Sequence, residues 1–119
     1  MSKPQYRLQK IVEKIDYIQK IVADYDSLEE ALADKTRTLP AILMHLASMA
    51  EQFNKLSRDG EYEILAYFDK SDLKGCYDLR NYIVHDYEGI NLDIISKVIR
   101  ERLPIIKATA QKLLDFYTK

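Results

Sequence analysis

Glycine and proline are scarce in this chain, and that scarcity restricts the possible folds more than any other feature. Three of each occur among 119 residues. A fold of many short strands needs turn residues at frequent intervals, so the sequence argues against an all-β protein. The stretches between these residues instead carry apolar side chains at the i, i+3, i+4, i+7 spacing of amphipathic helices. The sequence therefore predicts an all-α fold.

Four long stretches carry this pattern: residues 5–23, 38–57, 72 to 85 or 87, and 91 or 93 to the C-terminal end. Ser27, three residues before Glu30, predicts the cap of an extra short helix, and the acidic connector 58–71 predicts helical turns around 62–68. Pro104 removes a backbone hydrogen bond from the last helix and predicts a bend there. We therefore expect one domain over residues 1–119, an antiparallel four-helix, up-and-down bundle with an extra short helix and a kinked last helix.

The third helix is expected to turn its own apolar stripe toward the core. Its expected inward-facing residues are Leu73, Cys76, Tyr77, Ile83 and Val84. Gly89 is expected to stop this helix. Cys76 is the only cysteine, so the chain has no disulfide framework and no multi-cysteine zinc site. Its expected role is that of a small core residue.

The charge balance excludes several classes of protein. Lysine and arginine total 18 against 19 aspartates and glutamates, a formal net charge of −1. This balance is not that of a generic polybasic nucleic-acid-binding protein or of an acidic disordered tail. No apolar run approaches the ~20 residues that span a bilayer, and the basic N-terminal stretch lacks the apolar region of a secretory signal. We expect a cytoplasmic protein with no membrane contact.

The densest group of reactive side chains lies near the end of the third helix and reads Arg80-Asn81-Tyr82-Ile83-Val84-His85-Asp86-Tyr87. Asn81 and His85 share a helix face one turn apart, and Arg80 lies about 140° from His85 around the helix. An arginine can neutralise phosphoryl oxygens while a histidine moves a proton, which suits phosphate chemistry. A solvated helix end, with a histidine that complements the helix dipole, is the competing interpretation.

The last helix predicts a second interaction surface. It is apolar on more than one side because Ile94, Ile105 and Phe116 flank its main stripe, which favours a homodimer contact. It also carries five basic residues against one glutamate, which would give a cleft rim a basic face: Lys97, Arg100, Arg102, Lys107 and Lys112. Arg102 projects near the apolar stripe, so we expect it to be ion-paired or at an interface.

The motif at 80–87 resembles the signature of the HEPN superfamily, specifically the HepT-like toxins of HepT/MntA toxin–antitoxin systems. That signature is an arginine, a polar residue, three variable residues, a histidine, any residue and a tyrosine. The chain matches it without departure, and the segments at 79, 88–95 and 103–104 are also similar. One departure lies in the second helix, where relatives usually have a Gly-Glu-Ala-like stretch and this chain has Ala50-Glu51-Gln52. The extra methyl group of Ala50 predicts slightly wider helix packing.

The resemblance implies a metal-independent endoribonuclease that works as a homodimer, with two copies of the motif facing one cleft. It implies catalytic roles for Arg80 and His85, a supporting role for Asn81 and no cofactor or metal. Tyr82 and Asp86 are candidate cleft contacts. Tyr87 is implied as the site to which a cognate MntA-like nucleotidyltransferase antitoxin attaches AMP, which would block RNA binding by charge and bulk.

Two other functions remain open from the residues. His45, His85, Asp86 and Asp93 loosely resemble the ligand set of metal-dependent HD-domain phosphohydrolases, although a lone histidine such as His45 at the edge of an apolar stripe is more often a boundary residue. The other alternative is a non-catalytic helical binding subunit of a minimal nucleotidyltransferase.

Overall fold

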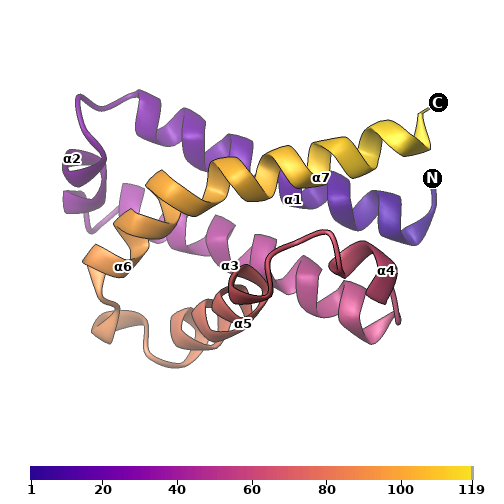
Figure 1. Ribbon diagram of the computed structural model, residues 1–119. Helices are drawn as coiled ribbons and strands as arrows, with labels where there is room; N and C mark the ends of the chain where they lie inside the picture. The colour runs from indigo at the N-terminus through magenta and orange to yellow at the C-terminus, as the bar shows by residue number, and fades with distance from the viewer. Residues whose placement is uncertain (119) are drawn as a thin grey trace.

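The computed structural model describes residues 1–118, with the side chain of Tyr87 excepted, and over these residues it contains helices and no strand. The all-α prediction is therefore confirmed. A 3₁₀ turn at Tyr87–Gly89 and a π-helical turn at Val98–Arg102 join the last elements. The α-helices, labelled in Figure 1, are α1 (Lys3–Ala23), α2 (Leu28–Ala33), α3 (Thr38–Arg58), α4 (Tyr62–Leu65), α5 (Lys70–His85), α6 (Leu92–Lys97) and α7 (Leu103–Tyr117).

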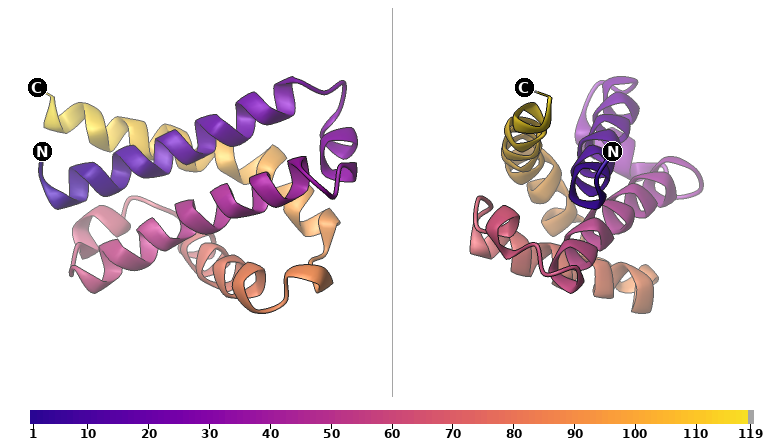
Figure 2. Two further views of the ribbon diagram at one scale, coloured as in Figure 1. Left: turned by 180° about the vertical axis from the view of Figure 1, so that it is seen from behind. Right: turned by 90° about the vertical axis from the view of Figure 1, so that its right-hand side faces the viewer.

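Three helix pairs build the fold. α1 packs against α3 and α7, and α3 also packs against α5. Figure 2 shows α1 and α7 side by side with both chain termini at one end, and α5 on the other side of the molecule. Apolar hollows remain between α5 and the segment from α6 to α7. The four-helix, up-and-down form of the bundle therefore stays a prediction. The core residues with the largest fully buried side chains are Leu8, Ile11, Ile15, Ile18, Ile42, Leu43, Leu46, Met49, Leu56, Ile95 and Leu103.

Capping residues set the helix boundaries close to the predicted ones. The Ser27 hydroxyl accepts the N–H of Glu30 at 3.0 Å and begins α2, as predicted. The Asn91 side chain accepts the N–H groups of Asp93 and Ile94 at 2.9 and 3.3 Å and begins α6. The bend that Pro104 predicts occurs just before the proline, where the N–H of Leu103 bonds to the carbonyl of Val98 across the π-helical turn. The kinked last helix is confirmed.

The inward face of α5 differs from its predicted stripe. Tyr77 and Val84 are 55% and 54% exposed, so their predicted burial is wrong. The buried residues are instead spaced at i, i+4, i+7 and i+11: Asp72, Cys76, Leu79 and Ile83. The first residue of this buried face is an aspartate, so a prediction based on the spacing of apolar residues does not find it.

Gly89 does not stop the third helix, because α5 ends four residues earlier at His85. Gly89 closes the following 3₁₀ turn instead, with its N–H bonded to the carbonyl of Asp86 at 3.2 Å. A Cβ atom at this position would lie 2.5 Å from Oδ2 of Asp86. A side chain at this position would therefore displace the exposed carboxylate of Asp86 from its present place.

An ion-pair network that includes the buried carboxylate of Asp72 connects α5 to the last helical segment. Arg102 donates from Nε and Nη2 to the two carboxylate oxygens of Asp72 at 2.8 and 2.7 Å, and from Nη2 to Asp69 at 2.9 Å. The Asp72 carboxylate raises the pKa of Arg102. The prediction that Arg102 is paired is therefore confirmed. Cys76 is buried beside this pair, and the loss of hydration raises the pKa of its thiol to about 12, as expected for a core residue.

None of the helices described here combines the length and the apolar composition needed to cross a bilayer.

Candidate functional site

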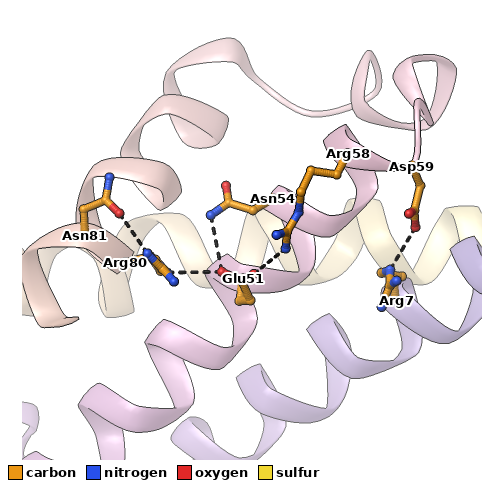
Figure 3. A network of polar contacts seen from close by, with 7 residues as sticks. All are labelled: Arg7, Glu51, Asn54, Arg58, Asp59, Arg80 and Asn81. Atoms are coloured by element: carbon orange, nitrogen blue, oxygen red, sulfur yellow. Dashed lines mark hydrogen bonds and ion pairs between the residues drawn. The ribbon is translucent and has the colours of Figure 1, made fainter.

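The guanidinium of Arg80 is held in place by one residue on α3 and one on its own helix. Its Nε lies 3.1 Å from Oε2 of Glu51 in an ion pair, and its Nη1 donates to Oδ1 of Asn81 at 3.1 Å (Figure 3). The Arg80 side chain is 34% exposed, so part of the guanidinium faces solvent. Two fixed partners restrict its rotamers and leave Nη2 without a partner within the described residues.

Glu51 is the centre of this network. Its other oxygen, Oε1, accepts from Nη2 of Arg58 at 2.6 Å, and Asn54 approaches Oε2 at 3.5 Å (Figure 3). The preceding residue, Ala50, is fully buried. From the sequence, Ala50-Glu51-Gln52 is only a difference from relatives that affects helix packing, and no role is predicted for Glu51. The sequence shows that Glu51 is an acidic residue on the polar face of the second helix. It does not show that Arg80 is its partner, because that contact depends on how α3 and α5 pack.

His85 is the last residue of α5 and is exposed. Over the part of the chain that the structure describes, it has no hydrogen bond or ion pair, so its ring is accessible to a substrate. Asn81 lies one turn earlier, but its carbonyl oxygen accepts from Arg80. The structure therefore gives Asn81 a contact with the arginine of the motif, and its supporting role stays a prediction.

The remaining motif residues shape the turn after α5. The N–H of Asp86 bonds to the carbonyl of Tyr82 at 2.8 Å, and the hydroxyl of Tyr82 donates to the carbonyl of Gly89 at 3.3 Å. The Tyr82 ring is 48% exposed. These bonds fold the chain back directly after His85. The predicted modification site on the side chain of Tyr87 lies outside what the structure describes.

The basic face predicted for the last helix is largely neutralised. Arg100 pairs with Glu29 at 2.5 Å and Lys107 pairs with Asp16 at 2.5 Å, while Arg102 contacts two aspartates. Three of its five cations therefore have carboxylate partners from other segments. An excess of positive charge along one helix does not produce a basic surface when neighbouring elements supply the opposite charge.

The residues suggested for a metal-dependent HD-type centre are not brought together. In residues 1–118, no three His, Cys, Asp or Glu side chains lie close enough to hold a metal ion. His45 instead lies between α3 and α1, with its ring centroid 5.2 Å from that of Tyr17. Burial there lowers the pKa of His45, as fits a boundary residue. The HD-type interpretation gains no support from this geometry.

One molecule thus presents on α5 an arginine that is fixed by two partners, Arg80, and an accessible histidine, His85. The motif itself supplies one of each per chain. A protein-family model described as ribonuclease HepT-like matches residues 11–113, which includes this whole motif. Neither the curated proteins nor the solved structures contain a match to the chain.

Proposed function

The chain belongs to the HepT-like family of ribonucleases, and on that premise we propose that it is a metal-independent endoribonuclease that acts as a homodimer. It is the toxin of a toxin–antitoxin system. The observation that carries this proposal is the placement of Arg80, held by Glu51 and Asn81, on the same helix as the exposed His85. These two side chains supply the charge stabilisation and the proton transfer that cleavage of an RNA linkage needs.

The proposed reaction is an internal displacement at phosphorus. One His85 takes the proton of the ribose 2′-OH, and the 2′-oxygen forms a new bond to the adjacent phosphorus. The bond from phosphorus to the 5′-oxygen breaks, and the partner's His85 donates a proton to that oxygen. The products are a 2′,3′-cyclic phosphate and a free 5′-hydroxyl. Arg80 stabilises the negative charge that builds up on the phosphoryl oxygens.

A homodimer explains how one chain can provide both an acid and a base. The two steps need one neutral and one protonated imidazole, and each chain supplies a single His85 at the motif. A two-fold axis through a shared cleft would bring both copies of His85 and of Arg80 to one substrate. The side chains of Ile94, Ile105 and Tyr82 are about half exposed and are available for such a contact.

Neutralisation by a nucleotidyltransferase follows from the same electrostatics. The cognate antitoxin would transfer AMP from ATP to the hydroxyl of Tyr87 and release pyrophosphate. The new phosphodiester carries a negative charge two residues from His85, where a substrate phosphate would have to bind. The attached nucleotide would also fill the cleft.

The purified protein is expected to cleave single-stranded RNA in the presence of EDTA. No step of the proposed reaction uses a metal, so a chelator should leave the rate unchanged within about twofold. Gel analysis of the products should show 5′-hydroxyl ends and 2′,3′-cyclic phosphates. Cleavage that EDTA abolishes would instead support a metal-dependent phosphohydrolase, and binding without cleavage would support a non-catalytic binding subunit.

Coexpression with the proposed cognate nucleotidyltransferase is expected to attach AMP to Tyr87 and to abolish growth arrest. Tyr87→Phe removes the acceptor hydroxyl but keeps the ring, so this variant should stay unmodified and toxic in the same cells. Peptide mass spectrometry locates the adduct, and Tyr82→Phe is the matched control that should still be modified. An unmodified Tyr87 in a neutralised complex would show that the antitoxin acts by simple occlusion.

A further inference from the structure

A hollow of about 330 Å³ lies between α3 and α5, next to the arginine of the motif. It is lined by Glu51, Asn54, Ser57, Arg58, Tyr77 and Arg80. We propose that this hollow binds the nucleotide next to the scissile linkage of a single-stranded RNA, with its backbone phosphate on Arg58 and its base on Tyr77. The inference rests on the proposed ribonuclease function and assigns a substrate-binding role to residues outside the motif.

The hollow has the donors that a phosphate needs. Arg58 bonds to Glu51 through Nη2 alone among the described residues, so its Nε and Nη1 are available to phosphoryl oxygens. The Arg58 side chain is 66% exposed and can adjust to a ligand. The amide of Asn54 and the hydroxyl of Ser57 add neutral hydrogen-bonding groups to the same wall. Planar guanidinium groups are well matched to phosphate geometry.

Glu51 does not prevent this use of the hollow. The two arginines contribute +2 and Glu51 contributes −1, so the lining carries a net charge of +1. Both carboxylate oxygens are already paired with arginine side chains: Oε1 accepts from Arg58 at 2.6 Å, and Oε2 lies 3.1 Å from Nε of Arg80 in an ion pair. The carboxylate therefore holds the two guanidinium groups beside one another. Glu51 is a positioning residue for both.

Tyr77 supplies a surface for the base. It lies one helical turn before Arg80 on α5, and it is 55% exposed although the sequence pattern predicted its burial. An exposed aromatic ring on the wall of a cationic hollow is the arrangement on which single-stranded bases stack, without selection for one base. The exposure of Tyr77 thus has a functional explanation.

The order of residues along α5 gives the path of the strand. At about 1.5 Å per residue, His85 lies about 7.5 Å from Arg80 towards the end of the helix, and Tyr77 lies about 4.5 Å away in the opposite direction. Arg80 belongs both to the motif and to the lining of the hollow. A strand whose scissile phosphate binds Arg80 would therefore extend its neighbouring nucleotide into the hollow, away from His85.

Binding of a 2′-O-methyl RNA oligonucleotide, which cannot be cleaved because its nucleophile is blocked, tests the proposal. Tyr77→Ala should weaken binding about tenfold or more, and Tyr77→Phe should retain the wild-type affinity. Arg58→Ala should remove one phosphate contact, which makes the slope of log affinity against log salt shallower by about 0.7. Both side chains are largely exposed, so the variants are expected to fold.

Matched controls separate this hollow from general surface effects. Lys20→Ala removes one exposed positive charge on α1, and Tyr67→Ala removes a 65% exposed ring after α4. Neither residue lines the hollow, and both variants should bind as the wild type does. Wild-type affinity and salt slope in Arg58→Ala and Tyr77→Ala would overturn the proposal. If RNA is still cleaved in that case, the proposed function stands, whereas a wild-type protein that neither binds nor cleaves RNA contradicts both.

Glu51→Gln gives a second test, because it separates two effects of Glu51: its positioning of Arg80 and its contribution to the net charge of the hollow. The amide raises the net charge of the lining to +2, so binding of the non-cleavable RNA should tighten and depend more steeply on salt. Arg80 loses its ionic partner, so kcat for a cleavable RNA should fall while KM does not rise. A variant with weaker binding and unchanged kcat would contradict the role assigned to Glu51.

Discussion

Arg80→Ala and His85→Ala are each expected to lower the rate of RNA cleavage by about 10²–10⁴-fold and to remove growth arrest. Loss of the imidazole removes both the base and the acid of the proposed reaction. Loss of the guanidinium leaves the charge on the phosphoryl oxygens without its main protein donor. The measurement is the initial rate on single-stranded RNA in EDTA, together with colony counts after induction.

The structure of the chain should survive both changes. His85 is exposed at the end of α5, and Arg80 lies at a partly exposed position outside the hydrophobic core. Circular dichroism and light scattering should therefore give the same helix content and the same mass as the wild-type protein, which we propose to be a homodimer. Arg80→Lys should restore little activity, because an ammonium group cannot keep the Glu51 and Asn81 contacts while it binds phosphate.

His45→Gln is the matched control for the histidine variant. His45, on α3, packs against the ring of Tyr17 on α1. The variant should cleave RNA at the wild-type rate in the ribonuclease account, but not in an HD-type metal centre that includes His45. Arg80→Ala and His85→Ala proteins that cleave RNA and arrest growth as the wild type does would show that the catalytic assignment is wrong.

The helices could be predicted from the sequence because their signals are local. The i, i+3, i+4 stripes place α1, α3 and the continuous segment from α6 to α7 within a few residues, and Ser27 and Asn91 mark helix starts through bonds to nearby N–H groups. For the third helix, the predicted burial of Tyr77 and Val84 was wrong, because the buried face of α5 includes Asp72. That carboxylate is buried only because Arg102, 30 residues later, reaches it.

The candidate site also contains residues that the sequence predicts and residues that depend on contacts between helices. The motif from Arg80 to Tyr87 is contiguous, so its residues could be found by their order alone. Glu51 could not be found, because its role depends on how α3 packs against α5. The basic face of the last helix was overestimated for the converse reason, since Glu29 and Asp16 arrive from α2 and α1.

A dimer with one wild-type chain and one His85→Ala chain is expected to be inactive. In the proposed reaction the base and the acid are the two copies of His85 on either side of one cleft, so a dimer with a single copy lacks one proton transfer. Its rate should be about 1% of the wild-type rate or less. Growth arrest should also be suppressed when the variant is coexpressed in excess.

The mixed dimer can be isolated with a different affinity tag on each chain, and its rate compared per dimer with that of the two parent dimers. A dimer of wild-type and His45→Gln chains, purified in the same way, should keep full activity and controls for the tags. A rate near that of the His85→Ala homodimer is the result expected of two motifs that serve one scissile phosphate. A rate of about half the wild-type value would mean that each subunit cleaves RNA on its own, and it would contradict the shared cleft.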